Sequence, residues 1–183
     1  LVVEGADIEA VVEGADEGAD EGSDEGAAVG AARPDGMTAL MLAAHQGHVE
    51  VARYLVGAGA DLVAKDDDGT TSLMWAAEKG HVNMAKCLVG AGVDIDAVNN
   101  KGTTALMSAA MNGNVYVTLY LLDKGAAVAA SQEDGKTALM FAAQNGNVEV
   151  ALRLLDKGAA IEAKDEDGKT ALMFAAQNGN VEV

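Results

Sequence analysis

Two stretches contain residue types that could bind a metal ion. His45 and His48, followed by a glutamate, place two imidazoles and a carboxylate within six residues, and zinc is commonly bound by these groups. Residues 66–69 (Asp-Asp-Asp-Gly) offer the alternating carboxylates and the glycine of a calcium-binding loop. In such a loop Ala64 would stand at the first ligand and Trp75 at the closing glutamate. The spacing therefore argues against a calcium site.

The sequence also contains partial signatures of a nucleotide-binding site and of a catalytic nucleophile. Residues 57–59 (Gly-Ala-Gly) supply two of the three glycines of a dinucleotide-binding turn. The third glycine is missing and the stretch follows a predicted helix, not a strand, so we interpret it as a helix end. Cys87 is the single cysteine, and no histidine lies beside it to activate the thiol. We interpret it as a packing residue on a half-exposed helix face.

Composition and charge restrict the class of protein. Half of the 183 residues are apolar but only 3% are aromatic, and no apolar run reaches the roughly 18 residues that cross a membrane. The net charge is −17: residues 1–32 hold ten acidic residues and no lysine or arginine, and the rest hold nineteen acidic and twelve basic residues, a net of −7. Nucleic acids and anionic membranes are therefore unexpected partners. One cysteine excludes an internal disulfide, which favours an intracellular setting.

The element that must position these residues is a repeat. The pattern Gly-x-Thr-Ala/Ser-Leu-Met-x-Ala-Ala occurs five times, every 33 residues. A fixed period of this length is typical of stacked supersecondary units. Each copy is followed three residues later by glycine and then histidine or asparagine. The five copies begin at Gly36, Gly69, Gly102, Gly135 and Gly168.

One unit can be interpreted as two short helices. Leu139, Ala142 and Ala143 fall on one face of a first helix, and Gly146 can end it in a left-handed conformation. Asn147 then suits the cap of a second helix over residues 148–155. Helices of about eight residues are unstable alone, so each unit needs neighbours. The second helix is expected to bury Val148, Ala151, Leu154 and Leu155.

The repeat resembles the ankyrin repeat. The 33-residue period, Asp-Gly-x-Thr-x-Leu, the paired alanines, Gly-His and the Gly-Ala-Asp at residues 59–61 carry the resemblance. It implies an all-α fold: an ankyrin-type helical solenoid of stacked helix-turn-helix repeats with short β-turn fingers. The family's Thr-Pro-Leu-His is Thr-Ala-Leu-Met here, so flexible apolar packing by methionine replaces the hydrogen bonds of that histidine.

The resemblance divides the chain into two parts. Residues 1–25 form an acidic, Gly/Ala-rich low-complexity segment, and we expect 13–25 to be disordered because nothing bulky is available for burial. Residues 1–10 align with 55–64, so the segment is either a linker or the tail of a degenerate repeat. The first residue is Leu, so we expect a fragment or a processed product. The array is expected over 26–183, with repeats 36–68, 69–101, 102–134, 135–167 and a truncated 168–183.

The repeat also explains most of the residues that suggested chemistry. His48 and His81 stand at the family's Gly-His position, where capping and bonding between repeats account for them, so we expect no metal. No Ser/His/Asp arrangement or carboxylate pair is placed independently of the repeat. We therefore expect no enzyme activity, no catalytic residues and no cofactor.

Positions that differ between copies are the candidates for recognition. In ankyrin-like proteins partners usually bind the turn tips and the inner helix, which form the concave face. One slot holds Leu42, Trp75, Ser108, Phe141 or Phe174, and its residue either packs between repeats or anchors a partner. Carried over by position, the candidates are Arg33, Asp66, Asp67, Thr70, Trp75, Glu78, Lys79, Asn100, Met111, Asn112, Glu133, Lys136, Phe141 and Gln144.

The sequence thus predicts a protein–protein interaction scaffold that binds a protein partner, of net basic charge, on this face. The chain is expected to be monomeric and to act in the cytoplasm or nucleus. One alternative is the regulatory array of a larger enzyme, such as a kinase, whose catalytic domain lies outside these residues. The other is a structural spacer with no specific partner. The fold does not identify the partner, because specificity depends on surface residues.

Overall fold

The computed structural model describes residues 29–182. Helices α3 to α11 in this range alternate between a first and a second helix of each unit, and the β-pairing within it is limited to two isolated bridges. The first helices are α3 (Ala39–Gln46), α5 (Ser72–Lys79), α7 (Ala105–Met111), α9 (Ala138–Gln144) and α11 (Ala171–Asn178). The second helices are α4 (Val49–Gly57), α6 (Val82–Gly90), α8 (Val115–Asp123) and α10 (Val148–Asp156).

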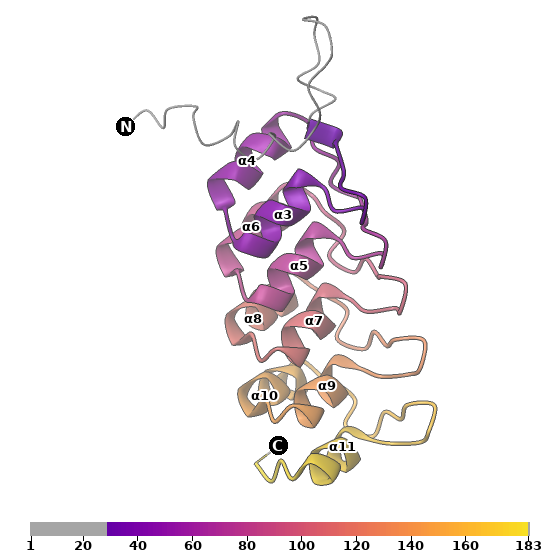
Figure 1. The fold of residues 1–183 in the computed structure, drawn as a ribbon. Helices are drawn as coiled ribbons and strands as arrows, with labels where there is room; N and C mark the ends of the chain where they lie inside the picture. Colours follow the sequence, from indigo (N-terminus) through magenta and orange to yellow (C-terminus); the bar gives the residue numbers. More distant parts are fainter. Residues whose placement is uncertain (1–28, 183) are drawn as a thin grey trace, which may run out of the picture.

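The helices stack in two columns. Each first helix packs on the first helix of the next unit, and each second helix from α4 to α10 does the same in its own column. The loops that join one unit to the next extend away from both columns, on the side of the first helices (Figure 1). We call these loops the fingers; each turns at one of the glycines that begin the repeat pattern. The predicted all-α helical solenoid is confirmed.

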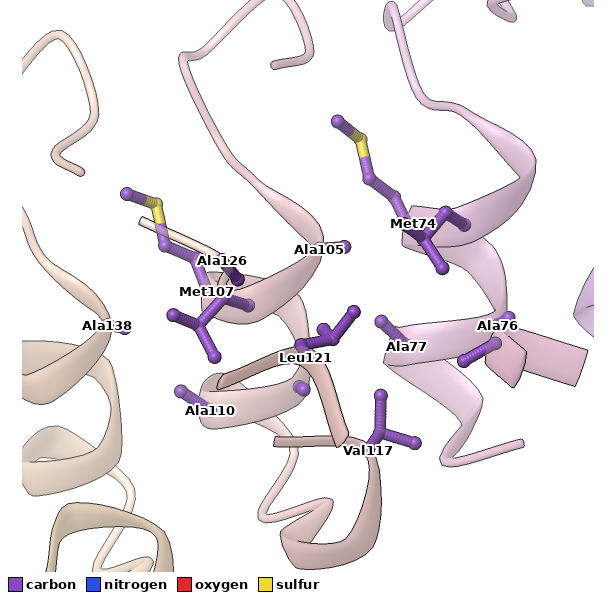
Figure 2. Packing of buried hydrophobic residues seen from close by; sticks show 14 of the residues in the cluster. Met74, Ala76, Ala77, Ala105, Met107, Ala110, Val117, Leu121, Ala126 and Ala138 are labelled. Carbon is purple, nitrogen blue, oxygen red and sulfur yellow. The ribbon is translucent and has the colours of Figure 1, made fainter. Parts of the chain in front are cut away.

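The first helices are defined by their caps and their buried faces. Thr71 precedes α5, and its Oγ1 accepts a hydrogen bond from the backbone N–H of Met74. Gly80 ends α5 with φ of 76°, a left-handed conformation that glycine adopts at little cost. From α3 to α9 the predicted Leu-Ala-Ala face is buried, and so is the methionine of the pattern, as Figure 2 shows for Met74 and Met107. Methionine fills the space beside the closely stacked alanines.

The second helix differs in detail from the prediction. It starts at Val148 as expected, but the buried residues of α10 are Val150, Ala151 and Leu154. Val148 is only half-buried, and Leu155 is 37% exposed. The equivalent of Leu155 in α8 is Leu122, which is 7% exposed, and the equivalents in α4 and α6, Val56 and Val89, are partly buried. Burial of this position therefore differs between the units.

The fingers are joined to one another by backbone hydrogen bonds. Within a finger, the N–H of Asp66 donates to the carbonyl of Thr70, and the N–H of Gly69 donates to that of Asp66. Between fingers, one N–H near each tip donates to a carbonyl of the preceding finger. These bonds are Asp67 to Asp35 (3.1 Å), Asn100 to Asp68 (3.0 Å), Glu133 to Lys101 (3.4 Å) and Glu166 to Asp134 (2.8 Å).

The expected low-complexity segment over residues 1–25 lies outside the described residues, as does its expected disorder over 13–25. The division of the chain at residue 26 and the limits of the repeats therefore stay predictions.

Helix α11 is expected to exchange its amide hydrogens faster than the middle of the array. Leu172 is 66% exposed, whereas Leu106, its equivalent in α7, is 1% exposed. Local opening costs little where few apolar contacts hold an element. Hydrogen exchange measured by mass spectrometry should show faster exchange after Gly168 than over residues 69–134. Equal protection in both ranges would contradict this expectation.

Candidate functional site

A glycine follows each first helix, and the residue after that glycine forms hydrogen bonds to the preceding unit. We call His81, Asn114, Asn147 and Asn180 the junction residues. Their side chains reach the carbonyl groups at the end of the preceding first helix, which lack partners within that helix. For example, Nδ2 of Asn114 donates to the carbonyls of Ala77 and Glu78, both at 2.8 Å. Asn147 and Asn180 make the same pair of bonds one and two units later.

This arrangement corrects one sequence-based interpretation. Asn147 lies at the N-cap position of α10, but its side chain makes no capping bond. It donates instead to Ala110 and Met111 of the preceding unit, at 2.8 and 3.1 Å. The ring of His81 occupies the equivalent place, with Nε2 3.2 Å from the carbonyl oxygen of His45. Of the two predicted roles of this position, bonding between repeats is the one observed.

Two of the three histidine rings contact other parts of the array. His45 meets the indole ring of Trp75 edge-on, with centroids 5.2 Å apart. His81 is engaged at the junction described above. Within residues 29–182, no three histidine, cysteine or acidic side chains converge to hold a metal ion.

Asp66 has a structural role inside its finger. Its Oδ1 accepts hydrogen bonds from the backbone N–H groups of Asp68 (3.1 Å) and Thr70 (2.8 Å). Its Oδ2 accepts one from Nε1 of Trp75 at 3.1 Å. The first pattern recurs at Asn99 and Asp165, which likewise stand three residues before the turn glycine. Asp66 therefore fixes the finger and orients Trp75, and both oxygens of its carboxylate accept hydrogen bonds.

Lys136 is paired within its own finger. Its Nζ lies 2.8 Å from Oδ2 of Asp134, and both side chains are 30% exposed. The hydrogen bond from Lys136 lowers the pKa of Asp134, and partial burial opposes this effect. The hydrogen bond to Asp134 raises the pKa of Lys136, and the charges of Asp165 and Asp167 add to it. Lys136 is thus a positive group held by acidic neighbours.

Removing this pair should change stability at acidic pH. A carboxylate whose folded pKa is lowered stabilises the fold above its unfolded pKa, and this contribution disappears as the pH falls through the folded pKa. Lys136→Met should therefore lower the free energy of unfolding by less than about 1 kcal/mol at pH 7, because solvent screens the partly exposed pair. Urea titrations at pH 7 and pH 3 should show a smaller difference in stability between the variant and the parent at pH 3, because the lowered pKa of Asp134 is being approached there. A difference of the same size at both pH values would show that packing, and not the pair, is responsible.

The other candidate residues vary in exposure. Asp67, Asn100, Asn112 and Glu133 are exposed near the finger tips or the end of α7, and Met111 is 37% exposed. Thr70 and Gln144 are half-buried. Two candidates are paired with neighbours: Arg33 with Asp35 at 3.2 Å, and Lys79 with Glu78 at 2.8 Å.

Phe141 is a correction to the candidate set. Its side chain is 7% exposed and belongs to the apolar core, and Phe174 in the same slot is 6% exposed. The sequence left packing and partner binding open for this slot, and at these two positions packing is observed. A partner cannot gain much contact area from a side chain that is already buried.

The exposed candidates share one side of the molecule. The fingers are bonded to their neighbours and the first helices stack, so the tips and the first-helix ends form one continuous surface (Figure 1). We call it the finger surface. It carries more acidic than basic side chains, interrupted by lysine and arginine. Its exposed members include Arg33, Asp67, Asp68, Lys79, Asn100, Lys101, Met111, Asn112, Glu133, Glu166 and Asp167.

Comparison with protein families agrees with this architecture. The family model for ankyrin repeats, described as three copies, matches residues 8–99, 62–132, 86–165 and 128–183. The chain belongs to the ankyrin-repeat family. No curated protein matches the sequence. The first ankyrin match begins at residue 8, inside the segment expected to precede the array.

Ankyrin repeats are in general modules for protein–protein interaction, and the family is typically non-enzymatic. In this ankyrin array the methionine that replaces the usual histidine is buried in every unit from α3 to α9. Among residues 29–182, no helix has the length and apolar character to span a membrane. The fold therefore presents two faces to solvent, the finger surface and the outer face of the second helices.

Proposed function

We propose that this ankyrin array binds a protein partner through the finger surface, the face that is concave in ankyrin-like proteins. The proposal rests on one observation: the residues that repeat in every unit and the residues that vary lie in different places. Residues that repeat in every unit, such as Leu73 and Ala76, are buried in the stack. Residues that differ between units, such as Asp67, Asn100 and Glu133, are exposed on one surface. Variation at exposed positions of a rigid scaffold is what specific recognition requires.

The chemistry of this surface fits a polar partner of net basic charge. Acidic side chains predominate near the tips, and charge complementarity mainly speeds association and sets the register of binding. Trp75 is the proposed aromatic anchor. Its indole N–H is bound to Asp66 and its ring rests against His45, so the half-buried ring is held in one orientation. A rigid aromatic loses little conformational freedom on binding.

Charge reversal on the finger surface tests the proposal. Asp67→Lys with Glu133→Lys should weaken capture of the partner at least about tenfold at low salt and much less at high salt. The control is Glu50→Lys with Glu149→Lys, which makes the same change of net charge on α4 and α10. Proteins retained by the parent should be identified by mass spectrometry, and their binding to both variants measured. Equal loss in both variants, or loss in the control alone, would contradict the proposal.

The cellular setting is also a proposal. We infer that the protein acts as a monomer inside the cell, in the cytoplasm or nucleus. The net charge of −17 disfavours nucleic acids and anionic membranes as partners. Cys87 is free and half-buried, which suits a reducing compartment.

A further inference from the structure

A recess lies between two neighbouring units, where the chain leaves a second helix and enters a finger. One wall comes from residues 62–65, which follow α4, and the other from residues 93–98, which follow α6. The volume of the recess is about 300 Å³. This is at the lower end of the range of ligand pockets, so the recess suits one or two side chains. None of the residues named above for the finger surface lines it, so it is a separate site.

Three valines make the recess apolar at positions where the repeat does not require an apolar side chain of this size. Val63, Val93 and Val98 all line it. In the units from 36–68 to 135–167, the position of Val63 otherwise holds aspartate, alanine or glutamate. The position of Val93 otherwise holds alanine, and that of Val98 otherwise holds lysine or serine. Three departures from the repeat, drawn from two units, therefore meet at one place.

Two of these valines do not contribute to the stack. Val63 is 71% exposed and Val98 is 43% exposed, and neither packs against the apolar core. Val93 is partly buried and packs against the core, as do Leu62 and Ala97, which also line the recess. Core packing thus explains Val93 but not Val63 or Val98. These two leave apolar surface in contact with water, which a ligand can cover.

Hydrogen bonds between units hold the walls of the recess in place. Nζ of Lys65 donates to the carbonyl of Val98 at 2.7 Å, which joins one wall to the other. Oδ1 of Asp96 accepts a hydrogen bond from the backbone N–H of Ala127 at 2.8 Å, which joins the second wall to the next unit. A recess that is already formed loses little conformational freedom when a ligand enters it.

The charged groups of the recess have a net negative charge. Asp94 and Asp96 line it together with a single cation, Lys65. Within residues 29–182, none of these three side chains forms an ion pair. Asp94 is exposed, and its Oδ1 accepts the backbone N–H of Asp96 at 3.0 Å. A complementary ligand therefore combines an apolar group with a positive charge.

We propose that this recess binds a segment of a protein partner in which an aliphatic side chain lies beside a lysine or arginine. The aliphatic side chain covers Val63 and Val98, and the neighbouring cation pairs with Asp94. An apolar centre with a charged rim is the usual composition of a protein interface. The proposal does not rest on the finger surface, because the two sites share none of the residues named for either.

A short peptide tests the recess directly. The probe is the acetylated and amidated peptide Gly-Lys-Ile-Lys-Gly, and the control peptide has glycine in place of isoleucine. Amide signals of the isotope-labelled full chain should be followed by NMR as each peptide is added. Peptide concentrations up to about 5 mM are needed, because one buried side chain and one or two exposed ion pairs give roughly millimolar affinity. Only the isoleucine peptide should shift the signals of residues 62–65 and 93–98 to saturation.

A first variant removes the apolar part of the recess. Val63→Ala with Val93→Ala and Val98→Ser introduces the residues that the third unit, 102–134, already holds at these positions. The variant should therefore stay folded, and circular dichroism should confirm this. It should weaken binding of the isoleucine peptide at least about threefold, because less apolar surface is covered.

A second variant removes the negative charge. Asp94→Asn with Asp96→Asn keeps the side-chain oxygens that accept backbone N–H groups. It should weaken binding about threefold at low salt and less at high salt, because exposed ion pairs are weak and screened. The matched control is Glu149→Gln with Glu162→Gln, which removes two exposed carboxylates from the fourth unit, 135–167, and should bind the peptide as the parent does.

Three results would overturn the proposal. The first is the absence of saturable shifts in residues 62–65 and 93–98 with the isoleucine peptide. The second is equal shifts with the glycine peptide, which would indicate attraction by charge alone. The third is the same shifts on concentrating the protein without peptide, which would assign the recess to a second copy of the chain. None of these results affects the finger surface, whose test uses Asp67 and Glu133.

Discussion

Replacing Leu106 with aspartate is expected to unfold most of the array, whereas the same change at Leu172 is expected to be nearly neutral. Leu106 is 1% exposed and lies in α7, between α5 and α9. Burying an unpaired carboxylate there adds its desolvation to the lost packing, so we expect a cost of about 4–5 kcal/mol or more. Leu172 is 66% exposed, where substitutions usually change stability by less than about 0.5 kcal/mol.

The effect should extend beyond the substituted helix. Units of a solenoid contact only their neighbours, and several must stack for any of them to be stable. Loss of α7 would leave α3–α6 on one side and α9–α11 on the other, each too short to stand alone. Urea unfolding followed by circular dichroism should show a large loss of helix for Leu106→Asp even without denaturant. A larger loss for Leu172→Asp would contradict the stacking model.

The sequence predicted the solenoid because its signal is repeated. Each copy of the pattern carries the same threonine, the same leucine and the same glycine, so agreement among five copies makes a chance match improbable. Burial of Leu155 could not be predicted in this way. The same position is 7% exposed at Leu122 of α8 but only partly buried at Val56 and Val89, although a further second helix packs on α4, α6 and α8 alike. The repeat pattern alone therefore does not decide burial at this position.

The candidate surface was harder to predict for a chemical reason. Differences between copies suggest recognition, but the position of Asp66, Asn99 and Asp165 varies between aspartate and asparagine while its residue performs the same task. Each side-chain oxygen accepts two backbone N–H bonds within its finger. Aspartate and asparagine both provide such an oxygen, so this variation is neutral. The hydrogen bond from Trp75 to Asp66 joins residues nine positions apart, and no pattern in the sequence predicts it.

Histidine and asparagine are likewise interchangeable at the junction residues. Removing the side chain of a junction residue is the second change for which we expect a large loss of stability. Asn114→Ala is expected to destabilise the array by about 1–3 kcal/mol, because it removes two short hydrogen bonds to carbonyls at the end of α5 and leaves that of Ala77 only the 3.4 Å bond from the N–H of Gly80. Asn114→His should recover much of the loss. His81 shows that an imidazole can stand at this position, with Nε2 3.2 Å from the carbonyl oxygen of His45.

Asn112→Ala is the matched control, since it removes the same group in the same unit. Nδ2 of Asn112 donates only to the carbonyl of Ser108, within α7, and the side chain is exposed. Its loss should therefore cost well below 1 kcal/mol, roughly the value of one exposed hydrogen bond. Urea midpoints of the four proteins should rank parent, Asn112→Ala, Asn114→His and Asn114→Ala, from most to least stable. If Asn114→Ala is no worse than Asn112→Ala, bonding between repeats is not what holds the units together, and stacking of the first helices must supply that stability alone.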